Sequence, residues 1–156
     1  MSKPSARKPT VMASGYQTSI RRTVIAALLV ILGIAWIAVY TNVAKDAALA
    51  LPGAKQPDNP LPWMADLEKW NYLIGFGLIF LGLAVSAHKN TPLGRGRGVV
   101  VGMLGCFLIG LVWIVTFYFL GSDNTSVPVM SDLGQYNLLV GIGFMAVGFT
   151  FATKWE

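Results

Sequence analysis

Four long apolar blocks divide this chain, and polar or charged residues separate them. The blocks cover residues 23–44, 70–88, 99–120 and 133–153, and none of them contains Asp, Glu, Lys or Arg. A helix rises 1.5 Å per residue, so about 20 residues cross the hydrocarbon core of a bilayer. An isolated strand would leave backbone groups unsatisfied in lipid, and the alternating pattern of barrel strands is absent. The pattern predicts an all-α membrane protein with four transmembrane helices.

The basic residues are distributed unevenly between the two sides of these blocks. Of the 12 Lys and Arg residues, nine lie in the N-terminal tail, the 88–98 link and the C-terminus, and three lie in the 45–69 and 121–132 loops. Basic segments stay in the cytoplasm. The sequence therefore predicts a multi-pass protein of the plasma membrane with both termini cytoplasmic.

The N-terminal segment is polar and basic, with two prolines and no acidic residue before residue 23. Such a segment buries too little apolar area to offset its ordering entropy, so we expect residues 1–22 to be disordered. A cleaved signal peptide is an alternative, with Ala48-Leu49-Ala50 as its cleavage motif. The apolar block is longer than a usual signal core and belongs to a repeat, which favours a retained helix.

Composition supports lipid as the main solvent of the chain. Hydrophobic residues make up 54% of the sequence and charged residues 12%, whereas soluble domains carry about 25% charged residues. The net charge is +5, but the basic residues flank apolar blocks instead of forming one face. That placement indicates orientation in a membrane, so we expect contact with membrane lipids and no nucleic-acid partner.

An internal repeat organises the chain. Residues 62–84 and 128–150 are identical at nine of 23 aligned positions, and residues 33–40 match 110–117, pairing Gly33 with Gly110. A unit with an even number of spans repeats in the same orientation, so we expect two parallel two-helix repeats. The predicted segments are a disordered basic tail (1–22), repeat 1 with a proline-rich external loop (23–90), a cytoplasmic basic link (91–98) and repeat 2 with a short external loop (99–156).

Small residues recur on one face of three blocks. Small side chains let helix backbones approach closely, which drives association in lipid. The predicted helix-packing positions are Gly75, Gly82, Ser86, Gly102, Cys106, Gly110, Gly141, Gly148 and Ala152. The partner across these faces is either another helix of this chain or another protein. Cys106 is interpreted as a packing residue, because apolar burial raises a thiol's pKa and leaves it inert.

The apolar blocks carry almost no ionisable chemistry. His88, the only histidine, falls at the cytoplasmic end of the second block, which excludes a haem held by two histidines of this chain. A proton-coupled pump would need a buried carboxylate, and the four apolar blocks contain no Asp or Glu. No nucleophile–base pair or metal-ligand cluster is present in the sequence, so we predict no enzymatic activity, no cofactor and no metal.

Polar and aromatic residues gather at the predicted outer boundary. We interpret Trp63, Trp70, Tyr72 and Tyr136 as an aromatic belt, with Trp155 at the inner boundary. The two asparagines at the start of the even-numbered spans suit a helix cap or an interfacial hydrogen bond, and the two repeated aspartates suit solvated residues near a helix N-terminus. The possible partner contacts at this boundary are Trp63, Met64, Asp66, Trp70, Asn71, Met130, Asp132 and Asn137.

The unit resembles the CrgA cell-division protein family of actinobacteria. The resemblance rests on Gly33 to Trp36, Trp63-Met64-Ala65 and Trp70-Asn71-Tyr72 in the first copy. In the second copy it rests on Gly110 to Trp113, Met130, Leu133, Asn137 and Lys154-Trp155. This chain differs from the usual single two-helix unit because two units are fused.

The resemblance implies a non-enzymatic membrane scaffold or regulator of cell division and septal peptidoglycan synthesis. The implied partners are divisome proteins such as FtsZ, FtsQ and FtsI, with septal enrichment and possible self-association. The alternative is a small transporter or channel subunit, or an accessory subunit of a membrane complex. A four-helix chain of this size is compatible with each of these functions.

The predicted topology can be tested by cysteine-accessibility labelling of intact cells. Single cysteines at Ser5 and Asn90 should be protected from an impermeant thiol reagent, and those at Gln56 and Thr125 should react. Labelling of intact cells at position 5 or 90 would overturn the orientation.

Overall fold

The computed structural model describes residues 18–51, 53, 58–122 and 127–154. Every regular element among these residues is helical, which confirms the all-α class. Residues 1–17 lie outside the described part, so the predicted disorder of the tail stays a prediction.

In the described part of the chain, four long helices and two short ones make up the fold. Helix α1 (Ile20–Val39) continues through a π-helical turn, η1 (Tyr40–Ala44), and α2 (Lys45–Ala48). The other long helices are α4 (Trp70–Ser86), α5 (Arg97–Ser122) and α7 (Tyr136–Ala152). The short helices α3 (Pro62–Asp66) and α6 (Met130–Leu133) precede α4 and α7.

The helix ends differ from the predicted block ends for local reasons. The first helix runs over Ile20–Ala48 instead of 23–44, because a charged residue ends an apolar block without ending a helix. The fourth begins at Tyr136 instead of Leu133, because Gly134 has a φ of +51° and interrupts the helix. Glu68, at the equivalent place in the first copy, also has a positive φ of +43°. The backbone of both copies therefore has a positive φ at the same place before the second helix, and only the second copy has a glycine there.

Two of the described helices are long and apolar enough to cross a membrane, Ile20–Ala48 and Arg97–Leu120. The other two long helices, α4 and α7, have 17 residues each. Many large apolar side chains on the span-length helices face outward, including Leu32 at 52% exposure and Phe119 at 70%. Apolar surface of this extent does not suit water, and it suits a lipid environment.

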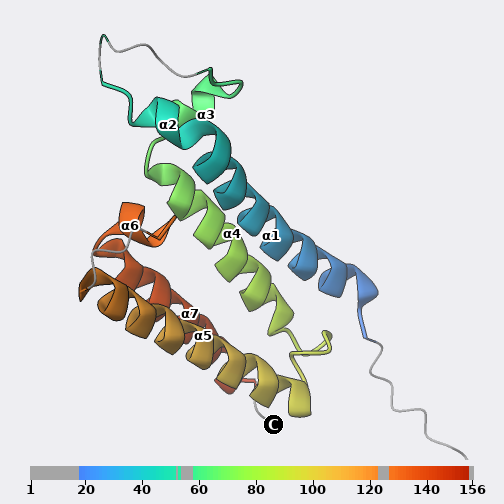
Figure 1. Ribbon diagram of the computed structural model, residues 1–156. Coiled ribbons are helices and arrows are strands. Elements are labelled where there is room, and N and C mark those ends of the chain that lie inside the picture. Colours follow the sequence, from blue (N-terminus) through green and yellow to red (C-terminus); the bar gives the residue numbers. More distant parts are fainter. Residues whose placement is uncertain (1–17, 52, 54–57, 123–126, 155–156) are drawn as a thin grey trace, which may run out of the picture.

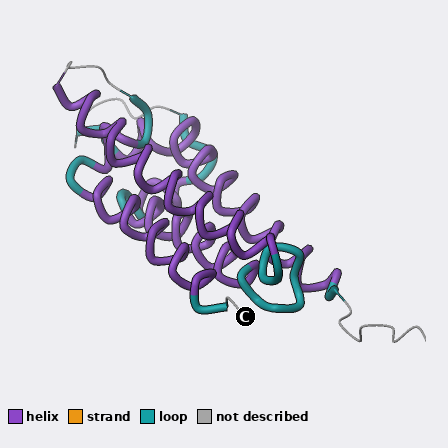
Figure 2. Tube along the Cα trace, turned by 90° about the horizontal axis from the view of Figure 1, so that it is seen from below, coloured by secondary structure: helices purple, strands orange, loops and turns teal. Residues whose placement is uncertain are grey.

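The long helices form two antiparallel pairs that meet through their second members. Helix α4 packs along α1, α7 packs along α5, and α4 also contacts α7 (Figure 1). The view from below shows the same lengthwise bundle (Figure 2). We call the end at which α4 passes into α5 the linker end, and the opposite end, which carries α2, α3 and α6, the loop end.

In the first pair, α1 and α4 touch backbone to backbone. A Cβ atom built on Gly33 would lie 2.5 Å from the carbonyl oxygen of Gly75, and one on Gly82 would lie 2.8 Å from that of Ala26. A Cβ on Gly75 would collide with the side chain of Ile37. These separations leave no room for a side chain on either helix at the crossing.

The second pair repeats this crossing at equivalent positions. A Cβ on Gly110 would lie 2.6 Å from the carbonyl oxygen of Gly141, and one on Gly141 would collide with Ile114. Gly148 is less constrained, since its nearest neighbours would lie 3.4 Å away, at ordinary contact distance. The glycine faces thus meet a helix of the same unit. Gly33, which matches Gly110 in the repeat, takes part although the predicted set of packing positions omits it.

The remaining small residues of the predicted set also lie within the pairs. The ring of Phe151 fills the space beside Gly102, where a Cβ would approach to 2.5 Å, and Cys106 is buried near Gly148. Ser86 is buried and donates a 2.6 Å hydrogen bond to the carbonyl oxygen of Leu83 on its own helix. Ala152, the last residue of α7, is half-buried.

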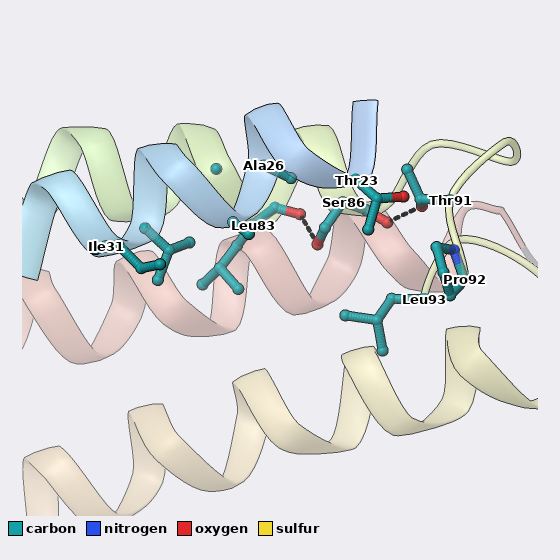
Figure 3. A pocket seen from close by; sticks show the side chains of 11 residues that line it. Thr23, Ala26, Ile31, Leu83, Ser86, Thr91, Pro92 and Leu93 are labelled. Carbon is teal, nitrogen blue, oxygen red and sulfur yellow. Dashed lines mark hydrogen bonds between the residues drawn. The ribbon is translucent and has the colours of Figure 1, made fainter. Parts of the chain in front are cut away.

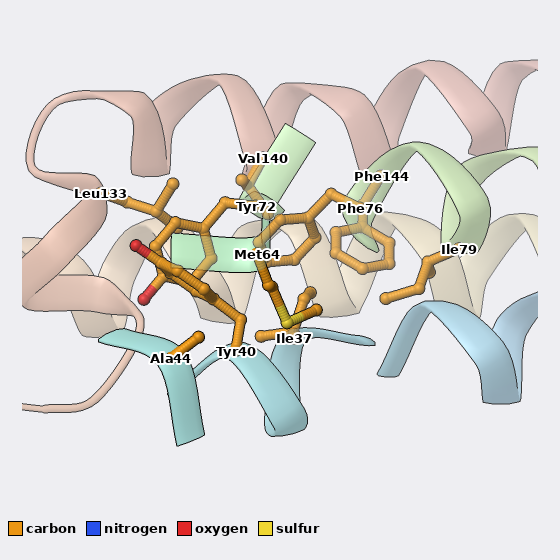
Figure 4. Packing of buried hydrophobic residues seen from close by; sticks show 10 residues of the cluster. All are labelled: Ile37, Tyr40, Ala44, Met64, Tyr72, Phe76, Ile79, Leu133, Val140 and Phe144. Carbon is orange, nitrogen blue, oxygen red and sulfur yellow. The ribbon is translucent and has the colours of Figure 1, made fainter. Parts of the chain in front are cut away.

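Aromatic rings fill the space between the two pairs. The ring of Phe80 lies where a Cβ on Gly143 would be, at 2.6 Å, and meets Phe144 edge to face with centroids 5.1 Å apart. Phe76 meets Trp113 edge to face at 5.6 Å. Figure 4 shows one buried cluster that extends from Ile37 and Tyr40 on the first pair to Leu133, Val140 and Phe144 on the second.

Substitution of the crossing glycines tests whether close backbone contact stabilises each helix pair. Gly33→Ala and Gly110→Ala should each lower the free energy of unfolding by about 1–3 kcal/mol, because the new methyl group overlaps a carbonyl oxygen. Gly105→Ala is the matched control, since a Cβ there meets nothing within 4 Å, and it should be neutral or stabilising by up to about 1 kcal/mol. Denaturant titration in lipid–detergent micelles measures all three. Equal stability of the three variants would show that the crossings are incidental.

Candidate functional site

A polar cluster at the loop end links the two helix pairs. The ammonium group of Lys45 lies 2.7 Å from Oδ2 of Asp132, and the hydroxyl of Tyr72 donates a 2.7 Å hydrogen bond to the same oxygen. Lys45 and Tyr72 come from the first pair and Asp132 from α6 of the second, 60 residues beyond Tyr72. Tyr72 also meets Tyr40 edge to face at 5.1 Å, which fixes its ring.

The environment of Asp132 favours its charged form. Burial by itself would raise the pKa of this carboxyl group, but the Lys45 ammonium and the Tyr72 hydroxyl outweigh it and hold the pKa below its usual range. The side chains of Lys45 and Asp132 are 25% and 20% exposed. This ion pair is therefore partly shielded from water, in contrast to the solvated aspartate that the sequence indicates.

An asparagine fastens each short helix to the long helix that follows it. Asn71 donates from Nδ2 to the carbonyl oxygens of Met64, at 2.7 Å, and Glu68, at 2.9 Å. In the second copy, Asn137 donates to Met130 and Gly134 at 2.6 and 2.7 Å. Both asparagines are fully buried. They satisfy carbonyl groups of the preceding turn, so of the two expected roles, a helix cap and an interfacial hydrogen bond, the cap of helix N–H groups is not the one they take.

Each copy also leaves the same two buried polar atoms without a partner among the described residues. These atoms are the indole nitrogens of Trp36 and Trp113 and the amide oxygens of Asn71 and Asn137. The repetition shows that this feature belongs to the unit. It is not an accident of one copy.

The predicted contact residues fall into surface and interior groups. Trp63 and Trp70 are exposed, at 50% and 66%, and so is Asp66. Met64 is buried, as are the two asparagines, so these three are not available to another protein without rearrangement. Met130 and Asp132 are half-buried.

One residue of the predicted aromatic belt lies elsewhere. Tyr136 is exposed together with the two tryptophans of the loop end, whereas Tyr72 is 2% exposed and points into the cluster with Asp132. A Trp-Asn-Tyr run at the start of a span is typical of an interface, but only the packing of α4 decides which of its side chains face lipid. Trp155 lies outside the described residues.

The linker end is basic and ordered by hydrogen bonds. The guanidinium group of Arg22 lies 2.6 Å from Nε2 of His88, and the Ser19 amide donates to the carbonyl oxygen of Asn90 at 2.8 Å. Desolvation and then the positive charge of Arg22 lower the pKa of His88 and so favour the neutral form of the ring. The buried Thr91 hydroxyl donates to the carbonyl oxygens of Ser86 and His88.

A cavity of about 360 Å³ lies beside this corner, between α1, α4 and the linker. Its walls are almost wholly apolar and include Ala26, Ile31, Leu83 and Leu93 (Figure 3). Within the described residues, no group of three His, Cys, Asp or Glu side chains is placed to hold a metal ion.

The chain is similar to one family of known proteins. The family model described as "Cell division protein CrgA" matches the chain twice, over residues 1–90 and again over residues 86–156. No solved structure matches the chain.

Individual relatives match about half of the chain and most of their own length. A cell division protein CrgA of Streptomyces avermitilis is 43% identical over 67 residues, which are 43% of this chain and 75% of the relative. The CrgA protein of Corynebacterium aurimucosum is 33% identical over 76 residues, 46% of this chain and 80% of the relative. That of Mycobacterium avium is 32% identical over 80 residues, with 46% and 86% covered.

Two successive matches to one family model explain why the packing contacts of α1 and α4 recur in α5 and α7. One unit of this chain corresponds to most of a whole relative. The chain belongs to the CrgA family of cell division proteins, as a tandem duplication of the family's unit.

Proposed function

We propose that this chain is a non-enzymatic integral membrane scaffold or regulator of cell division and septal peptidoglycan synthesis. The observation that carries this proposal is the double match to the cell division family, which accounts for the whole chain. The two glycine-packed helix pairs support it, because they are closely packed and have exposed apolar sides and polar ends. Such a body suits the assembly of other membrane proteins around it.

In this proposal all four long helices span the membrane as two parallel units with both termini in the cytoplasm. The 17 residues of α4 and of α7 fall at the lower end of the range that crosses a bilayer. Each packs along a helix of full span length. Arg22, Lys89 and Lys154 lie at the linker end, which is therefore the cytoplasmic end by the positive-inside rule.

The proposed partners are the divisome proteins FtsZ, FtsQ and FtsI, which the family resemblance implies. At the loop end, the exposed Trp63, Asp66 and Trp70 offer a surface for an extracytoplasmic domain of a partner. Tryptophan is enriched where interfaces concentrate their binding energy. At the linker end, the basic residues face the cytoplasm and the anionic lipid surface.

The polar cluster at the loop end makes the two units act as one body. Lys45 and Tyr72 of the first unit hold Asp132 of the second, while the aromatic rings of Phe80 and Phe144 pack below them. Polar and aromatic contacts of this kind fix the relative position of the units more narrowly than apolar packing alone.

A fluorescent fusion to the full chain tests the proposed function. In dividing cells the fusion should be enriched at the septum, because a divisome component assembles there. The control is an unrelated four-span protein with the same fluorophore, which should outline the cell evenly. An even outline for this chain as well would remove the support for a divisome role and favour the transporter or accessory-subunit alternative.

The polar cluster predicts a pH-dependent contribution to stability. Because the native pKa of Asp132 is lowered, its contribution is fully present above the ordinary carboxyl pKa of about 3.9 and is lost as the pH falls through the native value. Asp132→Asn should therefore lower the free energy of unfolding by up to about 1 kcal/mol near neutral pH, and the difference should vanish in strong acid.

The matched control is Asp66→Asn, which alters the equivalent but exposed aspartate of the first unit. It should change stability little at any pH. The measurement is denaturant titration of both variants and the wild type from about pH 7 down into strong acid, below the lowered native pKa of Asp132. A stability loss for Asp132→Asn that is the same at both limits would rule out the ion pair as its cause.

A further inference from the structure

A groove of about 520 Å³ opens between α4 and α7 at the loop end, beside the polar cluster, since Tyr72 and Asp132 also line it. Its volume is typical of pockets that bind small molecules. The walls are mainly apolar and include Leu73, Phe76, Gly77, Phe80, Leu139 and Val140. Leu73 and Leu139 are both 61% exposed, so the groove is open along its side as well as at its end.

The two copies differ in the space that lies beside an equivalent glycine. Gly77 and Gly143 are equivalent in the repeat, and Phe80 of the first copy corresponds to Ala146 of the second. Phe80 fills the space beside Gly143, whereas a Cβ on Gly77 would meet no atom within 4 Å. The notch beside Gly77 is therefore open, and the residue of the second copy that corresponds to Phe80 is the small Ala146.

The length of the groove matches half of a bilayer. Lys69 lies at its mouth and Phe80 at its far end, eleven residues further along. At 1.5 Å per residue this distance is about 16 Å of helix, and the hydrocarbon core of a bilayer is about 30 Å thick. One acyl chain of a lipid covers the same depth. A helix about 10 Å wide cannot enter between α4 and α7, because these two helices contact each other.

A lysine lies at the mouth of the groove. Asp132 lines it but is already paired with Lys45, while Lys69 is exposed and has no ion-pair partner among the described residues. Trp70 and Tyr136 stand beside Lys69, at 66% and 59% exposure. Indole and phenol groups favour the headgroup level of a membrane, where a lipid phosphate lies.

We propose that this groove binds one anionic phospholipid, with an acyl chain along Gly77 and the phosphate at Lys69. The inference rests on the proposed transmembrane arrangement, which places the mouth at a membrane surface. In this arrangement Leu73 and Leu139 contact the acyl chain from opposite sides. The charge of Lys69 gives a preference for anionic over zwitterionic lipids.

Photolabelling of the full-length protein in lipid nanodiscs tests whether the groove binds an acyl chain. The probes are phosphatidylglycerol and phosphatidylcholine with a photoactivatable group in the acyl chain, and labelled peptides are located by mass spectrometry. Label from phosphatidylglycerol should concentrate in the residues of α4 and α7 that line the groove. Gly77→Leu should abolish this labelling, because the new side chain fills the notch.

Gly105→Leu is the matched control, since a Cβ at Gly105 on α5 also meets nothing within 4 Å. It should leave the labelling of the groove unchanged. Because both glycines border open space, both variants should fold, and denaturant titration checks this directly. Unchanged labelling in Gly77→Leu, or label spread evenly over α1 and α5, would overturn the proposal. Cross-linked pairs of chains at the groove would overturn it too, in favour of a second copy as the occupant.

The charge-recognition part is tested with Lys69→Gln. This variant should equalise labelling by the two lipids, whereas Lys89→Gln at the linker end should preserve the preference for phosphatidylglycerol. A preference that survives in Lys69→Gln would overturn the assignment of the phosphate to this lysine. If the wild-type fusion is enriched at septa while its groove takes no label, this inference alone fails. An even distribution with a labelled groove removes the divisome role alone.

Discussion

Close contact between helix backbones is the constraint on which the rest of this structure depends. In lipid, apolar side chains gain nothing from leaving the solvent, so helices associate through dispersion forces that act only at short range. At the crossings of Gly33 with Gly75 and of Gly110 with Gly141, a single methyl group would hold the helices apart. These crossings set the rotation of α4 and α7 about their own axes. Their rotation in turn decides that Tyr72 faces inward and Trp70 faces outward.

The contacts inside the units and the contacts between them follow different rules. The glycine crossing and the asparagine hydrogen bonds of the first unit recur in the second unit, at equivalent positions. Between the units, aromatic rings and one ion pair occur once. The duplicated contacts are those that a single unit needs in order to fold, so both copies retain them. The contacts found once depend on the fusion, which holds the units together and lets each copy change separately.

The number and type of the long helices could be predicted from the sequence, because an apolar block is a local signal that depends on composition alone. The helix ends could be predicted only approximately, since Gly134 interrupts an apolar run without adding charge. The glycine faces could be predicted from the spacing of small residues along each apolar block. Gly33 could be recognised as a packing residue only through its match with Gly110 in the repeat. The pairing of Lys45 with Asp132 could not be predicted, because it depends on how two units dock and has no counterpart within the repeat. For the same reason, the sequence places Tyr72 at the membrane boundary, whereas the packing of α4 buries its side chain.

The difference between Phe80 and Ala146 has a geometric consequence for the whole molecule. When two identical units meet through the same surface, every contact occurs twice and a half-turn leaves the assembly unchanged. In this chain the notch beside Gly143 is filled and that beside Gly77 is open. Asp132 is paired and Asp66 is exposed. A half-turn therefore no longer reproduces the molecule, and its two lateral sides are distinct. An assembly of identical units has no direction in the plane of its membrane, whereas this chain has one.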